Sequence, residues 1–304
     1  MSLTALAPAA VVPPPGRSPA GAGTVPLPLP GPGWGAADAL LALAQAAPRL
    51  PVTVPVSGAE PVSVLTTVVL RAGGYAVKVY PPGTDPAHLA RLTTALAGST
   101  AAHLPRLPPE VTAHGVVTVT DWLPSAAPVT WSELGALLRC FHDQHAGARV
   151  PAWAPLSRLA SQIACLRPEA ADVLLRARDV LLQALAEVGS ELGEGLIHGD
   201  VSPSNVLRVP GGPRLIDLDW VASAPREYDL SSASRRFRAG EIGRSTYAGF
   251  CRAYGFDVCS WAGLPVLDRV ADLGGVAFRI WDSRHHGRGL DWLDRELDVW
   301  RTPL

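Results

Sequence analysis

Three oxygen-bearing side chains in the second half of the chain stand at spacings that suit phosphate chemistry. Asp200 lies five residues before Asn205 in a short loop, and Asp217 follows twelve residues later at the end of an apolar run. Carboxylate and amide oxygens are ligands that Mg²⁺ prefers. Phosphoryl transfer needs metal ligands, a base for the attacking hydroxyl and a cation on the phosphates. The three residues therefore indicate a phosphoryl-transfer site.

Each of these acids also has a simpler interpretation. An isolated aspartate in a loop is normally a turn or helix-cap residue, so the prediction depends on the combined spacing and not on Asp200 alone. Asp219 fits both a place near the metal and a solvated carboxylate at the end of a strand. Asp229 fits a buried carboxylate that accepts backbone N–H groups and never meets a substrate.

The amino-acid composition singles out Lys78 as the candidate cation for the phosphates. Lys78 is the single lysine among the 26 lysines and arginines of this 304-residue chain. Alternation along residues 75–80 places its side chain on the strand face opposite Val77 and Val79. A compact ammonium fits between phosphate oxygens where a forked guanidinium does not sit equivalently. The alternative is an ordinary solvent-facing lysine.

Two short motifs support a family resemblance. The loop reads H-G-D-V-S-P-S-N, and I-D-L-D-W and then Y-D-L follow it. Over roughly residues 50–300 the chain resembles the aminoglycoside phosphotransferase and choline kinase family, which has a protein-kinase-like fold. The resemblance implies that Asp200 orients and deprotonates the acceptor hydroxyl and that Asn205 and Asp217 hold Mg²⁺. It also implies that His198 braces the loop, that Asp219 is a further metal or water contact, and that Asp229 ties the following segment to the loop.

The resemblance further implies ATP or GTP as the phosphate donor, with Lys78 at the α- and β-phosphates. The other implied nucleotide contacts are Ser57 and Gly58 in a phosphate-covering loop, the backbone of Asp121 and Leu123 at the hinge, and Leu207 and Ile216 beneath the purine.

Two features depart from the family pattern. Relatives pair the strand lysine with a glutamate on the next helix, yet the expected helix at 85–98 has no acid after Asp85. A threonine, a water or Glu60 are candidate replacements. The phosphate-covering segment around Gly58 has one glycine and also fits an ordinary hairpin turn. A weakly active, nucleotide-binding pseudokinase is therefore an alternative.

Hydrophobic periodicity divides the chain into a small mixed lobe and a larger helical lobe, which predicts an α+β, two-lobed fold. The resemblance implies that this two-lobed fold is protein-kinase-like. Residues 1–33 are rich in Pro, Ala and Gly and predict a disordered leader. Residues 34–124 predict a small antiparallel sheet (runs at 52–56, 62–70, 75–80, 110–113 and 116–121) with helices at 36–47 and 85–98. Residues 125–304 predict a larger, mainly helical lobe, with helices at 132–146, 155–165, 168–190, 240–254, 265–284 and 289–301 and short strands near 205–209 and 213–217.

The acceptor site is expected after residue 235, where acids occur near tryptophans. Asp268 and Asp272 share one helix face and are the expected contacts to a cationic, polyhydroxylated ligand. Solvated helix faces with local ion pairs are the alternative, because arginines are about as frequent there. The favoured acceptor is the hydroxyl of an aminoglycoside-like antibiotic or amino-sugar, and the alternative is a small-metabolite kinase of the choline, homoserine or sugar type.

Net charge, apolar runs and cysteine spacing argue against several other classes of protein. A formal net charge of −1 gives no basic field for nucleic acid, and no apolar run is long enough to cross a membrane. The four cysteines show no metal-site or disulfide spacing. These features predict a cytoplasmic protein. The resemblance implies a small-molecule partner, and both a monomer and a homodimer are left open.

Overall fold

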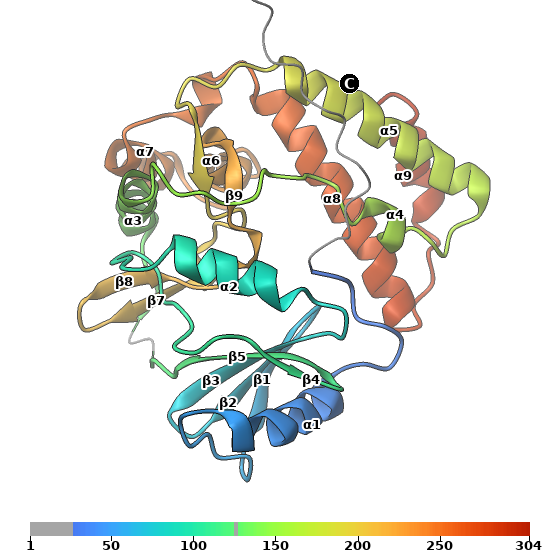
Figure 1. The fold of residues 1–304 in the computed structure, drawn as a ribbon. Coiled ribbons are helices and arrows are strands. Elements are labelled where there is room, and N and C mark those ends of the chain that lie inside the picture. Colours follow the sequence, from blue (N-terminus) through green and yellow to red (C-terminus); the bar gives the residue numbers. More distant parts are fainter. Residues whose placement is uncertain (1–26, 125–126) are drawn as a thin grey trace, which may run out of the picture.

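A five-stranded antiparallel sheet in the order β1-β2-β3-β5-β4 forms the smaller of two lobes (Figure 1). The computed structural model describes residues 27–124 and 127–304. The strands are β1 (Glu60–Val64), β2 (Val68–Ala72), β3 (Tyr75–Tyr80), β4 (Glu110–Thr112) and β5 (Gly115–Asp121). β3 and β5 lie inside the sheet, where their β-branched residues pack on both faces.

The two faces of this sheet are covered by different elements. Helix α1 (Ala36–Ala46), followed by a single 3₁₀ turn at Ala47–Arg49, packs its alanines and Leu43 against Val77 and Val79. On the opposite face, Leu89 of α2 (Pro86–Ala95) packs with Tyr80 and Val116. Asp85 accepts a hydrogen bond from the Ala87 N–H and so caps α2. The alternation of β3 therefore places Lys78 on the α2 face.

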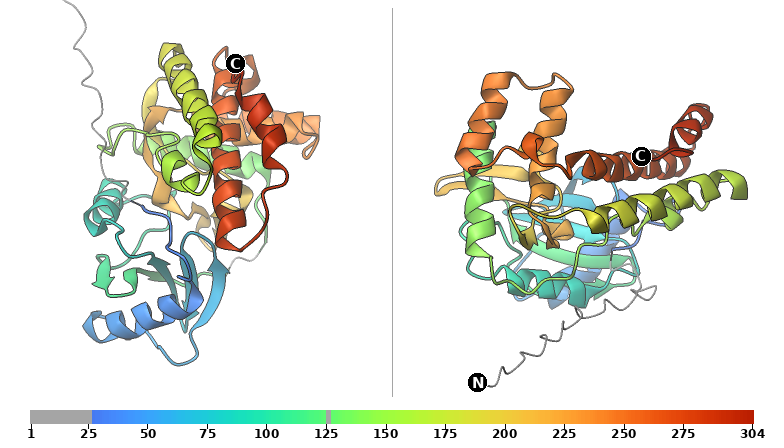
Figure 2. Two further views of the ribbon diagram at one scale, coloured as in Figure 1. Left: turned by 90° about the vertical axis from the view of Figure 1, so that its right-hand side faces the viewer. Right: turned by 90° about the horizontal axis from the view of Figure 1, so that it is seen from above.

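The larger lobe is mainly helical (Figures 1 and 2). Its helices are α3 (Trp131–Gln144), α4 (Leu159–Gln162), α5 (Pro168–Glu187), α6 (Glu227–Arg238), α7 (Arg244–Tyr254), α8 (Leu264–His285) and α9 (Leu293–Trp300). Two antiparallel ribbons complete it: β6 (Glu194–Ile197) with β9 (Ala222–Pro225), and β7 (Val206–Val209) with β8 (Gly212–Leu215). Short 3₁₀ turns lie at Pro203–Asn205, Leu218–Trp220 and Val258–Ser260. No described helix combines the length and apolarity that crossing a bilayer requires.

Several expected elements differ from the structure. The run at 62–70 is two strands joined by a turn, in which the Leu65 N–H donates to the Thr67 carbonyl at 2.9 Å. The run at 52–56 is not a strand, and the expected helix at 155–165 is reduced to α4. Helix α6 and the β6–β9 ribbon were not expected, because the α6 sequence is polar overall and the two ribbon strands are only four residues long.

The folded part of the chain begins earlier than expected. Residues 1–26 of the predicted disordered leader lie outside the described residues, but residues 27–33 are part of the fold. Leu27 is 4% exposed and packs with Tyr80, Leu89 and Val116. Arg158 of the larger lobe donates from Nε to the Leu27 carbonyl at 2.7 Å. This segment therefore contacts both lobes before α1 begins.

Candidate active site

A buried carboxylate fixes the loop that carries Asp200. Asp229 on α6 is 2% exposed and accepts hydrogen bonds from the His198 N–H at 2.7 Å and the Gly199 N–H at 2.8 Å. His142 Nε2 on α3 lies 2.8 Å from the same carboxylate. Gly199 has a φ of +86°, and a Cβ there would lie 2.4 Å from the Trp220 carbonyl oxygen. The sharp turn before Asp200 therefore requires glycine.

His198 braces the loop from the other side. Its Nε2 donates to the Ile216 carbonyl at 2.9 Å, and its Nδ1 accepts from the Asp200 N–H at 3.2 Å. His198 is fully buried and both of its ring nitrogens are engaged, which fits the expected support of the Asp200 loop.

The Asp200 side chain lies beside Asn205. Asn205 Nδ2 donates to the Asp200 carbonyl at 2.9 Å and to its Oδ2 at 3.0 Å, and the Ile216 N–H donates to the Asn205 carbonyl at 2.9 Å. The last bond places Asn205 next to the segment that carries Asp217. Burial raises the pKa of Asp200, and the negative charge of Asp217 adds to the effect. A carboxylate with a raised pKa is a better proton acceptor.

Lys78 bridges two carboxylates from the segment after β8. Its Nζ lies 2.5 Å from Asp217 Oδ1 and 2.6 Å from Asp219 Oδ2, and Tyr80 Oη donates to Asp219 Oδ1 at 2.7 Å. Burial by itself would lower the pKa of Lys78, but the charge of Asp219 and its neighbours outweighs burial and raises it. Burial acts to raise the pKa of Asp217, yet the ammonium of Lys78 lowers it overall.

These contacts show which acids pair with Lys78 in place of a glutamate on α2. Glu60, one candidate replacement, is exposed on the edge strand β1. The acids that hold Lys78 are Asp219 and Asp217 instead. Both acids stand out in the I-D-L-D-W run, but the sequence led to their interpretation as metal contacts. Their distance from β3 along the chain conceals that they contact Lys78.

The donor set fits a Mg²⁺ ion held by few protein ligands. Among the described residues, no three His, Cys, Asp or Glu side chains are grouped to hold a metal ion. Asn205 and Asp217 are oxygen donors on segments joined by the bond from the Ile216 N–H to the Asn205 carbonyl. Mg²⁺ usually takes one or two protein ligands together with phosphates and waters. Both carboxylate oxygens of Asp219 are engaged by Lys78 and Tyr80. These bonds favour a role for Asp219 in holding Lys78, and a metal contact by Asp219 stays a prediction.

A cavity of about 150 Å³ lies beside these carboxylates. Its lining includes Asp200, Asp217 and Asp219 together with the β1–β2 turn at 65–67. Ser57 and Gly58 form a turn ahead of β1 and do not line this cavity. Contact of Ser57 and Gly58 with the phosphates stays a prediction, and the turn between β1 and β2, which contains no glycine, is a second candidate for that place.

The expected hinge follows the end of β5. The Asp121 carbonyl lies 3.0 Å from His103 Nε2, and its carboxylate pairs with Arg106 at 2.7 Å. Leu123 follows it in the connection between the lobes, and Leu207 and Ile216 are half-buried on and after the β7–β8 ribbon. Adenine contacts for these four residues stay a prediction.

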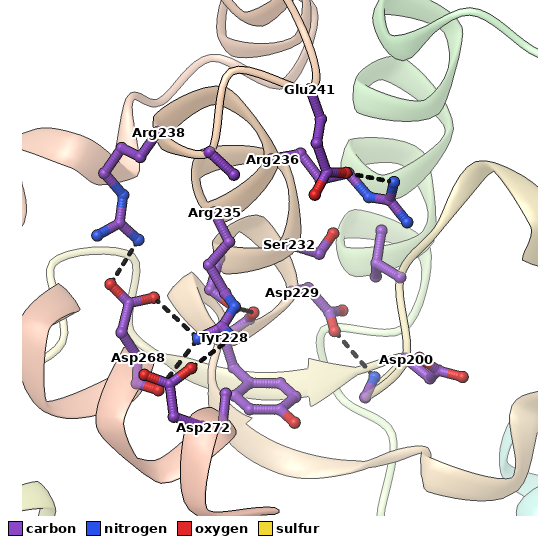
Figure 3. A pocket seen from close by; sticks show the side chains of 15 residues that line it. Asp200, Tyr228, Asp229, Ser232, Arg235, Arg236, Arg238, Glu241, Asp268 and Asp272 are labelled. Carbon is purple, nitrogen blue, oxygen red and sulfur yellow. Dashed lines mark hydrogen bonds and ion pairs between the residues drawn. The ribbon is translucent and has the colours of Figure 1, made fainter. Parts of the chain in front are cut away.

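A second cavity, of about 540 Å³, also has Asp200 in its lining (Figure 3). Asp268 and Asp272 on α8 line it, so the structure brings both expected acceptor contacts into one cavity with Asp200. Both carboxylates are paired with arginines, so their negative charges are not free to bind a cationic acceptor as expected. Arg235 donates to Asp272 Oδ1 at 2.6 Å, and Arg238 contacts Asp268 Oδ2 at 2.5 Å.

The arginines of α6 were the residues that sequence reasoning missed. Arg235, Arg236 and Arg238 all line the larger cavity, and Arg236 pairs with Glu241 at 3.0 Å. The sequence feature that could have indicated them is the run Arg-Arg-Phe-Arg at 235–238. The next acid along the chain is Glu241. Only the packing of α6 beside α8 shows that these arginines meet Asp268 and Asp272.

A two-lobed fold with a sheet lysine, paired aspartates and an H-G-D loop between the lobes defines a protein-kinase-like protein. A profile of the phosphotransferase enzyme family matches residues 35–273, so the chain belongs to this family. A search of curated proteins finds no match.

Solved structures share the fold. A choline/ethanolamine kinase family protein from Mesorhizobium loti is 18% identical, with 84% of this chain and 97% of that chain covered and a TM-score of 0.55. The choline kinase LicA from Streptococcus pneumoniae is 16% identical, with 84% and 94% covered and a TM-score of 0.60. The amicoumacin kinase hAmiN, solved with AMP-PNP and Ca²⁺, is 14% identical, with 77% and 86% covered and a TM-score of 0.56.

Proposed function

We propose that this protein transfers the terminal phosphoryl group of ATP or GTP to a hydroxyl of a small molecule. One observation carries the proposal: Asp200 lines both cavities, the smaller one beside Asp217 and the larger one beyond it. A base at this point can accept a proton from a hydroxyl in the larger cavity while a phosphate occupies the smaller one.

The chain's own residues supply positioning and charge. Asn205 and Asp217 would hold Mg²⁺, which supplies charge neutralisation at the phosphates when bound. Lys78 contributes a further cation at the same carboxylates. The Asp229 and His198 hydrogen bonds keep the Asp200 loop in place before substrate arrives, so little reorganisation is needed during transfer.

The charges around the larger cavity favour a small metabolite over an aminoglycoside as the acceptor. A polycationic ligand needs unpaired carboxylates, but Asp268, Asp272 and Glu241 each pair with an arginine. A neutral or mixed-charge acceptor with several hydroxyl groups does not need an unpaired carboxylate, so it can bind without displacing the arginines.

An acceptor panel tests the proposal. Purified protein with Mg²⁺ and ATP or GTP is incubated with neutral sugars, hydroxy-amino acids, choline and aminoglycosides, and phosphorylated product is measured by mass spectrometry. We expect product from a hydroxylated metabolite and none from Asp200→Asn. Nucleotide binding without product on any acceptor would contradict transferase activity and favour a nucleotide-binding pseudokinase. Preferred turnover of aminoglycosides would contradict the assignment of the acceptor class.

A further inference from the structure

Arg158 brings a positive charge to the smaller cavity without a carboxylate partner. It precedes α4, is half-buried, and lines this cavity together with Asp200 and Asp217. Among the described residues, no carboxylate oxygen lies within the 4.0 Å ion-pair distance of its guanidinium. Within residues 27–124 and 127–304 the guanidinium makes one hydrogen bond, from Nε to the Leu27 carbonyl at 2.7 Å. The two Nη groups are therefore left for another partner.

The guanidinium is held in place from several sides. Its Cζ lies 4.4 Å from the centroid of the Trp220 ring, so the group stacks on an aromatic face. The segment that leads to Arg158 is tied to β9, because the Trp153 N–H donates to the Ser223 carbonyl at 2.9 Å and the Ser223 N–H donates to the Pro151 carbonyl at 2.8 Å. With Nε bound to Leu27, the side chain is preorganised rather than free to swing into solvent.

An unpaired, partly desolvated cation is unfavourable until an anion arrives. Burial lowers the pKa of Arg158 to about 10, although the charge of Asp219 acts in the opposite direction. The group is still protonated at neutral pH. A guanidinium presents paired N–H donors that match phosphate oxygens, so a phosphate is the anion whose geometry suits it.

We propose that Arg158 binds the terminal phosphate of the nucleotide and keeps that contact while the phosphoryl group is transferred. The proposal rests on the proposed function. The phosphorus–oxygen bond to the leaving nucleoside diphosphate breaks, a bond to the acceptor oxygen forms, and the acceptor proton moves to the Asp200 carboxylate. Arg158 exchanges no proton and neutralises charge on the transferred group. Its position beside Asp200 is why the terminal phosphate, and not an inner one, is assigned to it.

The alternative is that Arg158 only anchors the segment at Leu27. The two roles separate when nucleotides with and without the terminal phosphate are compared. Binding of Mg-ATP and Mg-ADP is measured by calorimetry for the wild type, Arg158→Gln, Arg158→Lys and a matched control, Arg279→Gln. Arg279 also stacks on a tryptophan, at 3.8 Å from the Trp292 centroid, but lines neither cavity. Thermal melts report folding of each variant.

We expect Arg158→Gln to weaken ATP about tenfold or more, as for loss of a charge-assisted hydrogen bond, and ADP by less than about threefold. Arg158→Lys keeps the charge but loses the bond to Leu27, and should retain part of the ATP preference. Equal loss for ATP and ADP, or no loss, would overturn the proposal even if the melting temperature falls.

A second probe separates this proposal from the proposed function. If the wild type binds neither ATP nor GTP, the proposed function fails, and inorganic pyrophosphate then tests the anion site alone. Stabilisation of the wild type and Arg279→Gln by pyrophosphate, absent in Arg158→Gln, would support an anion site at Arg158. No stabilisation of the wild type, or equal stabilisation of all three proteins, would overturn it.

Discussion

The Nζ atom of Lys78 lies 2.6 Å from Oδ2 of Asp219, and Tyr80 Oη donates to the other oxygen of this carboxylate at 2.7 Å. Lys78 and Tyr80 are on the same face of β3, whereas Asp219 belongs to the larger lobe. The pair therefore connects the two lobes at the site where nucleotide phosphates would bind. It also positions the single lysine of the chain without an acid on α2.

Replacing this lysine tests whether its chemistry matters. We expect Lys78→Arg to lower kcat/KM for nucleotide by about tenfold or more, because a planar guanidinium cannot occupy the compact position between Asp217 and Asp219. The measurement is steady-state phosphoryl transfer. Arg91→Lys, in an exposed ion pair with Asp85, is the control and should be unaffected. Undiminished transfer by Lys78→Arg would contradict a specific role for the lysine at the phosphates.

Replacing Asp219 should disturb the position of Lys78 and leave the Mg²⁺ requirement unchanged. We expect Asp219→Asn to lower transfer while leaving the Mg²⁺ concentration for half-maximal rate unchanged, because its oxygens are engaged by Lys78 and Tyr80. Asp217→Asn should instead raise the Mg²⁺ requirement. Titration of the rate with Mg²⁺ checks both. A raised requirement in Asp219→Asn would mean that Asp219 leaves the lysine to bind metal.

Sequence predicted most of the site because its members lie in short motifs. The H-G-D loop and I-D-L-D-W run are each continuous, so Asp200, Asn205 and Asp217 could be selected before any fold was known. Lys78 was found because strand alternation and composition both single it out. The two-lobed fold followed from a change in hydrophobic periodicity, which is a strong local signal.

What sequence missed depends on contacts between distant segments. Asp219 could not be assigned to Lys78 because 141 residues separate them. The glycine at position 58 drew attention away from the turn between β1 and β2, since a turn of Leu, Thr and Thr inside an apolar run has no breaker. Leu27 lies in a Pro-rich segment whose composition predicts disorder, and only packing against Tyr80 and Leu89 overrides that propensity.

Removing the proposed base should separate activity from stability. We expect Asp200→Asn to reduce transfer by about 10²–10⁴-fold, with little change in nucleotide affinity. Because folding raises the pKa of Asp200, the ionised group destabilises the folded state at neutral pH, and stability is gained as pH falls. The amide should therefore give an equal or higher melting temperature. Asp172→Asn, in an exposed pair on α5, is the control. Full activity in Asp200→Asn would contradict its role.

As the pH falls, protonation of Asp200 should lower the rate of phosphoryl transfer before protonation of Asp217 weakens nucleotide binding. Asp200 must be ionised to accept a proton, and its pKa is raised above the ordinary 3.8, whereas that of Asp217 is lowered. As pH falls, kcat/KM for the acceptor should therefore decline at higher pH than nucleotide affinity does. Rate profiles and binding isotherms over the same pH range, with circular dichroism to show intact folding, check this. Coincident declines would indicate a shared cause.

The arginines of α6 should determine which acceptors are tolerated. Arg235 and Arg238 neutralise Asp272 and Asp268 on the wall of the larger cavity. The double variant Arg235→Gln, Arg238→Gln leaves both carboxylates unpaired there, so cationic acceptors should gain kcat/KM relative to neutral ones by about tenfold or more. The comparison uses a neutral sugar and its amino-sugar analogue. Arg288→Gln, in an exposed pair with Asp282, should leave the ratio unchanged. A ratio that stays constant in the double variant would show that these ion pairs do not select the acceptor.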